Sequence, residues 1–475
     1  MYARTFKNPV FLNVKRLGAL IKDKKLSPTE ITRTFLERLQ NIGPDYNSTV
    51  TITHDLAIKQ ASKAEQEIMQ GRYRGPLHGI PYGIKDLFAT GLDAPTTWGA
   101  SPFRNRTFDH NATVVINLKN SGAILAAKLA MIEMAGGMGY NQPDASLTGP
   151  CRNPWDKNRW AGGSSSGSGS AVGSGIVPFA IGTETWGSIL SPASYCGVTG
   201  LRPTFGRVSS YGAMTLSWSL DKVGPMALTA DDCGTVLETI SAPDDKHSAT
   251  SFTRHPLKKF DLKNRVKLAV IKDSCIHADK ATKDNFSNTL STLNAIADIE
   301  EISLPSYPYE AIIRTILLSE SASALEDFTD SGTASELTAP EGQYGPYART
   351  TIAAKDYIKA LRLRGKIAKE LDKLMSNFDC ILGPSRLSVA PQIDKHFAAA
   401  ISDDQQDEIG ALGNLLGLPA ISVPNGFSDM ALPTGLQLIG RWNDENNIID
   451  IASWYQMSTR WHDKHPKHLL QDTQN

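Results

Sequence analysis

Cysteine is scarce in this sequence, and it never occurs in a pattern typical of a disulfide framework or a zinc site. The chain of 475 residues has five cysteines, an odd number, and no two of them form a CxxC pair. They are Cys151, Cys196, Cys233, Cys275 and Cys380. We therefore expect reduced, buried thiols, and neither a metal nor a cofactor.

An excess of charge of one sign is also missing, and so is a long apolar run. The 49 basic residues balance the 49 acidic residues, so no long-range field steers the chain toward nucleic acid or an anionic membrane. No stretch approaches the about 18 to 20 apolar residues of a membrane span, and the first residues lack the apolar core of a signal peptide. We expect a cytoplasmic protein, a monomer or a homodimer, that binds a small-molecule substrate and neither nucleic acid nor membrane.

Short apolar runs bounded by glycine or proline predict buried strands. They lie at residues 177–181, 266–271, 381–382, 420–423 and 436–439. Helical patterns, for example at residues 348–375 and 446–457, alternate with these runs. Strands that alternate with helices indicate an α/β layered fold, with a mixed but mostly parallel central sheet flanked by helices.

The one low-complexity segment, Gly162 to Gly175, reads GGSSSGSGSAVGSG. By composition it is typical of a flexible linker. However, it runs directly into the apolar residues 176–181 and then into a second glycine-rich turn, Gly182 to Ser188. Small residues in this setting suit a backbone that packs closely or presents N–H groups to an anion. We therefore favour a packed, functional segment over a linker.

Ser165, inside this segment, is one candidate nucleophile. Gly163 to Gly167 fits the G-x-S-x-G elbow of the α/β-hydrolases, in which a later histidine would serve as base. This pattern arises easily in a serine-rich run, and an elbow needs a strand directly before it, whereas residues 153–160 read as a loop. The elbow is therefore the weaker interpretation.

A long, ordered set of segments resembles the amidase signature family. Between Gly149 and Met226 it comprises GPCRNPWDKNRWAGGSSSGSGSAVGSG, IVPFAIGTETWGSILSPASYCGVTGLRPTFGRVSSYGAM and SLDKVGPM. LHGIPYGIKDLF upstream and NLLGLPAISVPNGFSDMALPTGLQLIG downstream extend the resemblance over nearly the full chain. It implies one large α/β/α domain over residues 1–475, with its core at about 70–235 and 375–460 and a variable, substrate-shaping region at about 300–350.

The resemblance also implies roles for individual residues. The family's lysine base falls on Lys85, its cis-peptide serine on Ser164, and its nucleophile on Ser188, 24 residues further along. Ser165 falls on a serine that supports the site. The oxyanion hole is expected to consist of the backbone N–H groups of Thr185, Trp186, Gly187 and Ser188.

These residue types suit the chemistry of an amidase. A serine hydroxyl is a weak nucleophile until a base takes its proton, and a lysine is a base only when it is neutral. Burial can lower the pKa of a lysine from about 10.4 toward about 7 to 8. We expect Lys85 to take the proton of Ser188 through Ser164 and to return it to the leaving nitrogen. Asp86, beside the lysine, is expected to be a structural turn carboxylate.

Three positions around the nucleophile depart from the family. Its members usually have an aspartate, paired glycines and, two residues after the serine, an arginine; here Glu184, Trp186 and Leu190 occupy these positions. Trp186 either fills space behind the turn or lines the pocket, where it would favour an apolar or aromatic substrate group. Without the arginine, Glu184 must find other partners.

The departures favour a stand-alone amidase that cleaves a C–N bond of a non-peptide or linear amide. The alternative within the family is the glutaminase A subunit of a tRNA-dependent amidotransferase, which usually keeps the glycine-rich turn and the arginine. Carbamates (urethanes), ureas and nylon-type oligomers are alternative substrates, because the same acyl-enzyme chemistry serves them. A non-catalytic binding protein with a degraded site is the alternative from another class.

Overall fold

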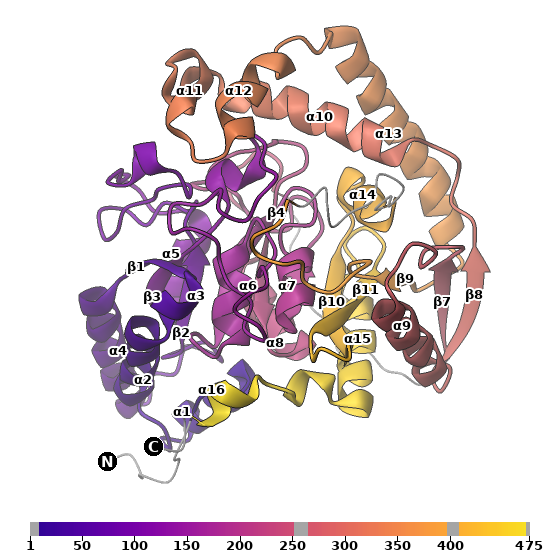
Figure 1. Ribbon diagram of the computed structural model, residues 1–475. Coiled ribbons are helices and arrows are strands. Elements are labelled where there is room, and N and C mark those ends of the chain that lie inside the picture. The colour runs from indigo at the N-terminus through magenta and orange to yellow at the C-terminus, as the bar shows by residue number, and fades with distance from the viewer. Residues whose placement is uncertain (1–8, 251–264, 397–407, 472–475) are drawn as a thin grey trace.

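The computed structural model describes residues 9–250, 265–396 and 408–471. Within these ranges eleven strands form one sheet, which crosses the molecule in Figure 1 between helices on both of its faces. The predicted α/β fold, with a mixed sheet flanked by helices, is thereby confirmed. In sheet order the strands are β1 (Thr49–Ile52), β3 (Ile124–Leu129), β2 (Pro81–Lys85), β4 (Phe179–Glu184), β6 (Lys222–Ala227), β5 (Thr199–Arg202), β10 (Ala420–Phe427), β11 (Pro433–Ile439), β9 (Cys380–Pro384), β7 (Val266–Ile271) and β8 (Ala297–Ile302).

The prediction that the sheet is mostly parallel is wrong. Of the ten strand pairings described, six are antiparallel and four are parallel. The antiparallel hairpin of β10 and β11 is buried along almost its whole length, as a parallel strand would be. Because helices cover both faces of the sheet, strands of either direction carry the same continuous apolar runs, and the pattern does not reveal direction.

The five predicted strands correspond to β4, β7, β9, β10 and β11, with ends displaced by a few residues. The predicted helix at 446–457 lies within α15 (Glu445–Thr459), whereas the pattern at 348–375 covers the end of α12 (Pro340–Arg349) and all of α13 (Ala354–Met375). The remaining strands were not predicted from apolar patterning. They are four residues long, as β1 and β5 are, or contain charged residues, as in Lys222–Ala227 and Ala297–Ile302.

Helices cover the sheet and surround the site. α2 begins directly after Ser27, whose hydroxyl accepts hydrogen bonds from the N–H groups of Thr29 and Glu30. α2 spans Pro28–Asn41, and the other helices are α1 (Val14–Lys22), α3 (Gly43–Tyr46), α4 (His54–Met69), α5 (Thr113–Ser121), α6 (Ser166–Gly173), α7 (Leu190–Cys196), α8 (Ala230–Ile240), α9 (Lys280–Leu293), α10 (Tyr309–Ala324), α11 (Glu326–Asp330), α14 (Glu408–Leu415) and α16 (Lys467–Gln471). Short 3-10 helices span Ser101–Phe103, Glu133–Gly136, Thr333–Glu336 and Trp461–Asp463.

Helices α10 to α13 lie together along one edge of the molecule, at the top of Figure 1. Of these, α10, α11 and α12 lie within the 300–350 region that the resemblance singled out as variable. The strand and helices that flank Ser164, Ser165 and Ser188 in the sequence, β4, α6 and α7, lie at the centre of the molecule. Of the helices in the described ranges, none combines the length and the apolar character that a membrane crossing requires.

Candidate active site

Lys85 is the last residue of β2, a strand whose five residues are all buried. Its side chain is fully buried, and its Nζ lies 2.7 Å from Ser164 Oγ and 2.9 Å from Thr183 Oγ1. Both hydrogen-bond partners are neutral hydroxyl groups. The amine is therefore held by groups that do not require it to carry a charge.

The surroundings of Lys85 favour a neutral amine near pH 7. Burial lowers the pKa of Lys85 to about 7, although the negative charges of Asp221 and Glu184 oppose this shift. An amine with this pKa can accept a proton at neutral pH and donate it again, as a general base and acid must. These surroundings suit the base role expected of Lys85, and that role stays a prediction.

The glycine-serine segment forms α6, a helix in which all eight residues are buried. A Cβ on Gly167 would lie 2.4 Å from the backbone nitrogen of Ala130, so the close approach of α6 to the neighbouring chain requires glycine. The segment is a packed element, and the flexible-linker alternative is wrong. The peptide bond from Gly163 to Ser164, just before α6, is cis, as the resemblance implied.

Ser165 is fully buried, and its hydroxyl both donates a hydrogen bond to the backbone of Thr183 and accepts one from it. Its Oγ donates to the Thr183 carbonyl at 3.1 Å and accepts from the Thr183 N–H at 3.3 Å. Its own N–H donates to the Ser188 carbonyl at 3.2 Å. Ser165 therefore ties the serine segment to β4 and to the Ser188 turn, a supporting position rather than the exposed one that an elbow nucleophile occupies.

The turn from Thr185 to Ser188 joins β4 to α7. Gly187 has a φ of +80°, a left-handed conformation that favours glycine. Within the described chain, the N–H groups of Thr185, Trp186, Gly187 and Ser188 have no protein acceptor, so the turn presents unbonded donors. Such a cluster of N–H groups can receive a developing oxyanion.

Ser188 itself is 9% exposed, at the mouth of this turn. Within the described residues its hydroxyl makes no hydrogen bond to Ser164 or to another side chain. The structure therefore brings Lys85 and Ser164 into direct contact and places Ser188 on the segment bonded to Ser165. The link between the two serine hydroxyls is not formed in this conformation.

The carboxylate of Glu184 stabilises the end of this turn through hydrogen bonds. One of its carboxylate oxygens accepts the N–H groups of Ile189 and Leu190, at 2.8 and 2.9 Å, and the other lies 2.8 Å from Arg202 Nη1. Burial acts to raise the pKa of Glu184, but the charges of Arg202 and Lys222 outweigh it and lower the pKa. Arg202 thus takes the role of a partner for Glu184, while Leu190 packs in the core.

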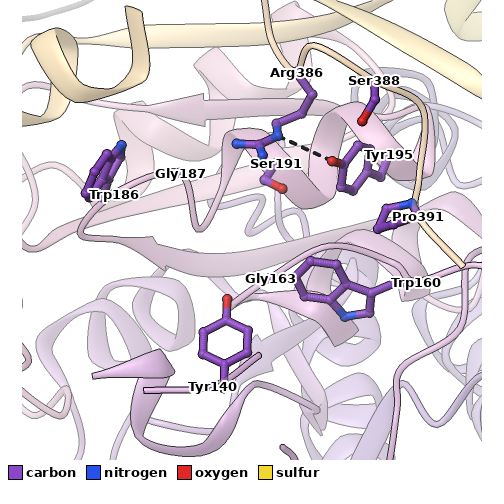
Figure 2. Close-up of a pocket in the computed structure, with 10 residues that line it drawn as sticks. All are labelled: Tyr140, Trp160, Gly163, Trp186, Gly187, Ser191, Tyr195, Arg386, Ser388 and Pro391. Carbon is purple, nitrogen blue, oxygen red and sulfur yellow. Dashed lines mark hydrogen bonds between the residues drawn. The ribbon is translucent and has the colours of Figure 1, made fainter. Parts of the chain in front are cut away.

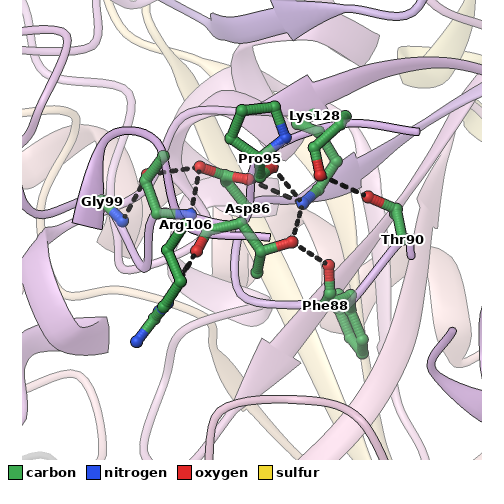
Figure 3. A network of polar contacts seen from close by, with 10 residues as sticks. Asp86, Phe88, Thr90, Pro95, Gly99, Arg106 and Lys128 are labelled. Atoms are coloured by element: carbon green, nitrogen blue, oxygen red, sulfur yellow. Dashed lines mark hydrogen bonds and ion pairs between the residues drawn. The ribbon is translucent and has the colours of Figure 1, made fainter. Parts of the chain in front are cut away.

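Asp86, directly after the lysine, belongs to a separate buried network (Figure 3). Its Oδ1 lies 2.8 Å from Lys128 Nζ, and both side chains are fully buried. Its Oδ2 accepts from the hydroxyl and the N–H of Thr97. Lys128 also donates to the Pro95 carbonyl and to Thr96 Oγ1. Asp86 is therefore fully engaged in holding loops around β2, in agreement with the structural role expected for it.

A pocket opens beside the two segments that contain Ser164 and Ser188 (Figure 2). Gly163 and Gly187, which directly precede Ser164 and Ser188, are part of its lining. The lining residues are Tyr140, Trp160, Gly163, Trp186, Gly187, Ser191, Tyr195, Arg386, Ser388 and Pro391. Trp186, whose place the sequence left open, is a pocket residue that also packs against the core, and the Arg314 guanidinium lies 5.3 Å from its ring centroid.

Sequence reasoning missed Thr183, Arg202 and the pocket residues that follow β9. Thr183 is a polar residue near the end of an apolar strand, and Arg202 is a charged residue between Leu201 and Pro203. Such residues indicate buried polar contacts, because buried polar groups need hydrogen-bond partners. Arg386 lies 222 residues from Ser164 in the sequence, and nothing in the local pattern connects the two.

Three or more His, Cys, Asp or Glu side chains arranged to hold a metal ion are not found in the described part of the chain. Its five cysteines are free, and all but Cys275 are buried.

Comparisons with known proteins find similar chains over nearly the full length of this one. The family model described as Amidase matches residues 30–449. The chain is 32% identical to the glutamyl-tRNA(Gln) amidotransferase A subunit of Carboxydothermus hydrogenoformans, over 96% of this chain and 99% of that protein. The structure is similar to that of the peptide amidase of Stenotrophomonas maltophilia, with a TM-score of 0.86, 26% identity and coverage of 98% and 100%. It is also similar to the glutamyl-tRNA(Gln) amidotransferase A subunit of Thermotoga maritima, with a TM-score of 0.76, 28% identity and 95% coverage of both chains.

Proposed function

The chain belongs to the amidase family, and we propose that it acts as a stand-alone amidase that hydrolyses a C–N bond of an amide-like substrate. The observation that carries this proposal is the contact between the fully buried Lys85 amine and Ser164 Oγ at 2.7 Å. A lysine that is buried among hydroxyl groups is prepared to act as a base rather than as a surface charge.

In this proposal Ser188 is the nucleophile, Ser164 the relay and Lys85 the base. As Ser188 Oγ attacks the substrate carbonyl carbon, its proton passes to Ser164, and the Ser164 proton passes to Lys85. The N–H groups of residues 185 to 188 stabilise the oxyanion, each by about 3 to 4 kcal/mol in a typical hydrolase. The protonated lysine returns its proton through Ser164 to the leaving nitrogen. Water then hydrolyses the acyl ester on Ser188 by the same proton path in reverse.

The glutaminase A subunit remains the main alternative, because the curated relative cited above carries that name. Two observations favour the stand-alone enzyme. Trp186 occupies the turn and lines the pocket together with Trp160, Tyr140 and Tyr195, which suits a substrate with an apolar or aromatic group. Glu184, the carboxylate before the turn, also differs from the family pattern: it pairs with Arg202, because position 190 has a leucine in place of the usual arginine.

In this proposal, residues 300–350 take part in selecting the substrate. Arg314 of α10 lies over the Trp186 ring, and Glu133, which follows β3, accepts the N–H groups of Thr338 and Ala339. Both contacts connect the outer helices to segments of the site. A change in this region would therefore reach the pocket through Trp186.

The test uses a fluorophosphonate probe and a panel of substrates on the purified chain without a partner. We expect the probe to label the wild type, Ser188→Ala to abolish labelling, and Ser165→Ala to retain part of it. Labelling lost in Ser165→Ala but kept in Ser188→Ala would establish the elbow instead. No labelling of the wild type would favour a non-catalytic protein.

The panel then separates the remaining substrate classes. It comprises aryl amides, aliphatic amides, nylon-type linear oligomers, carbamates, ureas and glutamine. Hydrolysis of simple amides without glutamine dependence supports the proposal. Activity on glutamine alone, and only with an added partner chain, would overturn it. Faster hydrolysis of carbamates than of matched amides would assign the urethane alternative.

A further inference from the structure

The turn from Thr185 to Ser188 needs anchors other than its own N–H groups, because in the described chain those donors have no protein acceptor. The far end of the turn is held through its carbonyl groups. The Gly187 carbonyl accepts from the Ser191 N–H at 2.8 Å, and the Ser188 carbonyl accepts from the Ser165 N–H at 3.2 Å. The near end, at Thr185, requires anchors of another kind.

Thr185 is held by two consecutive residues at the point where the chain enters β6. Its hydroxyl donates to Asp221 Oδ1 at 2.6 Å, and its carbonyl accepts from Lys222 Nζ at 3.3 Å. Glu184 and Lys222 pair in the antiparallel register of β4 and β6, so Asp221 lies opposite Thr185, one residue beyond this pair. The register of the sheet thus brings both anchoring side chains to the first residue of the turn.

Asp221 also holds the loop that precedes β6, residues 216–221. Its Oδ2 accepts from the N–H groups of Leu216 and Ser217, at 2.8 and 3.0 Å. The N–H of Asp221 in turn donates to the Ser217 carbonyl at 2.9 Å. One carboxylate therefore connects the 216–221 loop to the first residue of the 185–188 turn.

Two outer helices hold the 216–221 loop from its other side. Glu320 of α10 is only 6% exposed, and its carboxylate accepts from the hydroxyl groups of Ser217 and Ser219 and from the Ser219 N–H. Arg364 of α13 donates to the Ser219 carbonyl at 3.0 Å. A continuous series of hydrogen bonds therefore runs from α10 and α13 through the loop and Asp221 to Thr185.

Such a series suits the requirement of an oxyanion hole. Hydrogen bonds to a carboxylate are stronger than those between neutral groups, so both carboxylates of the series fix the groups that they contact. Donors that are fixed before the reaction need no reorganisation when the negative charge develops. A displacement of reacting groups by about 1 Å can lower a rate by about a hundredfold, so the anchors of the turn matter as much as its donors.

We propose that Asp221 is a positioning residue of the 185–188 turn, and that its hydrogen bond with the Thr185 hydroxyl aligns the N–H groups of the turn for the transition state. Through Glu320 and the 216–221 loop, α10 acts on the same turn. This inference rests on the proposed function, because an oxyanion forms only when Ser188 attacks a carbonyl. A contact that aligns transition-state donors acts on kcat, so its loss lowers kcat and leaves KM almost unchanged.

Two exchanges at Thr185 separate the hydroxyl from the rest of the side chain. Thr185→Val keeps the shape and removes the donor to Asp221, and kcat for the best amide of the panel should fall about tenfold to a hundredfold, with KM within about twofold. Thr185→Ser keeps the donor and should retain most of kcat. Thr113→Val, which removes a hydroxyl of α5 that donates to Asp244, is the matched control and should keep the wild-type kcat. Unchanged kcat in Thr185→Val, or an equal loss in Thr185→Ser, would overturn the inference.

A double-mutant cycle assigns the effect to Asp221. Asp221→Asn removes the negative charge from the acceptor of the Thr185 hydroxyl, and alone it should lower kcat several-fold. If Asp221 acts through Thr185, the variant with both Asp221→Asn and Thr185→Val should lose less than the product of the two single losses. Losses that multiply would show that the two residues act independently, which contradicts the inference.

Variants of Glu320 test the connection to α10. Glu320→Gln keeps one acceptor oxygen and Glu320→Met keeps none, so kcat should fall several-fold in the first and further in the second, again with little change in KM. Glu326→Gln, which changes an exposed carboxylate at the start of α11, is the control for the loss of charge. If Glu320→Met does not fold, Glu320→Gln decides. Wild-type kcat in the folded Glu320 variants would remove α10 from the inference.

Titration with the fluorophosphonate probe counts the active sites of each variant and separates the outcomes. A wild type that the probe does not label and that hydrolyses no amide overturns the proposed function, and the inference with it. A labelled and active wild type, together with wild-type kcat per labelled site in Thr185→Val, overturns the inference alone. A loss of kcat per labelled site in Thr185→Val, retained in Thr185→Ser, supports it.

Discussion

Lys85 and Lys128 are two fully buried lysines on neighbouring parallel strands, yet they lie in opposite surroundings. Lys85 contacts two neutral hydroxyls, whereas Lys128 contacts the carboxylate of Asp86, a carbonyl and a hydroxyl. Because Lys128 pairs in register with Ile84, the residue before Lys85, the two side chains leave the sheet on opposite faces. One face thus holds a lysine suited to proton transfer and the other a lysine suited to holding loops.

The difference shows that burial alone does not assign a role to a lysine. Burial lowers the pKa of both residues, but for Lys128 the nearby Asp86 charge and its hydrogen bond oppose the shift directly. For Lys85 the opposing charges belong to Asp221 and Glu184, and neither makes a hydrogen bond to its Nζ among the described residues. The partner group therefore decides between a base and a structural ion pair.

The largest expected effect is on catalysis, from Lys85→Met. Removing the base should lower kcat/KM by about 10³- to 10⁴-fold, because Ser188 would lose its proton acceptor. The melting temperature should not fall, because methionine fills a similar volume without a buried amine. Kinetics with an aryl amide and thermal unfolding measure the two effects. Retention of more than a tenth of the activity would remove Lys85 from the mechanism.

Lys128→Met should act on stability instead. It leaves the Asp86 carboxylate buried without its cation, which we expect to lower the free energy of unfolding by about 3 to 5 kcal/mol. Urea unfolding of the single variant and of Lys128→Met/Asp86→Asn measures the effect. The double variant should recover most of the loss, since the uncompensated charge is gone. No loss in the single variant would show that the ion pair does not stabilise the fold.

The pH dependence of activity is a further test of the difference between Lys85 and Lys128. Lys85 must be neutral to act as a base, and burial places its pKa at about 7. As the pH falls below 7 the amine becomes protonated, so kcat/KM should decrease by about tenfold per pH unit, with a plateau above pH 8. A profile measured with a neutral aryl amide checks this. An acidic limb centred near pH 4 to 5 would indicate a carboxylate base instead.

The smallest effect is expected from Thr183→Val, which removes one hydroxyl from Lys85 and keeps the side-chain shape. The hydroxyl oxygen accepts more strongly from an ammonium than from an amine, so its loss should lower the pKa of Lys85 and move the acidic limb to lower pH. We expect kcat/KM at pH 8 to fall only several-fold, by roughly the worth of one hydrogen bond.

The same exchange in the other network is the matched control for Thr183. Thr97→Val removes a hydroxyl that donates to Asp86, the partner of Lys128. It should lower the free energy of unfolding by about 1 to 2 kcal/mol and leave the pH profile in place. A shift of the acidic limb in Thr97→Val would mean that the two networks are coupled through β2.

Much of the candidate site could be predicted from the sequence, because its residues lie in short segments that each have a recognisable sequence pattern. The segment that contains Lys85, the glycine-serine run and the turn to Ser188 each carry a recognisable pattern, and the structure brings Lys85 and Ser164 into contact. The glycine content also predicts close packing, since Gly167 meets the backbone of Ala130, the residue that follows β3. The structural role expected of Asp86 and the need of Glu184 for another partner also agree with the structure.

The tertiary structure alone decided which distant groups surround those segments. The predicted strand direction, mostly parallel, was wrong, because strands buried on both faces carry the same apolar pattern whether parallel or antiparallel. The pairing of Lys128 with Asp86, of Arg202 with Glu184, and the entry of Arg386 into the pocket depend on strand order across the sheet. By itself the sequence determined the identity and spacing of the reactive groups, which are local properties of the chain. Their charge environment and the pocket next to them depend on contacts between residues far apart in the sequence, and only the folded chain brings those residues together.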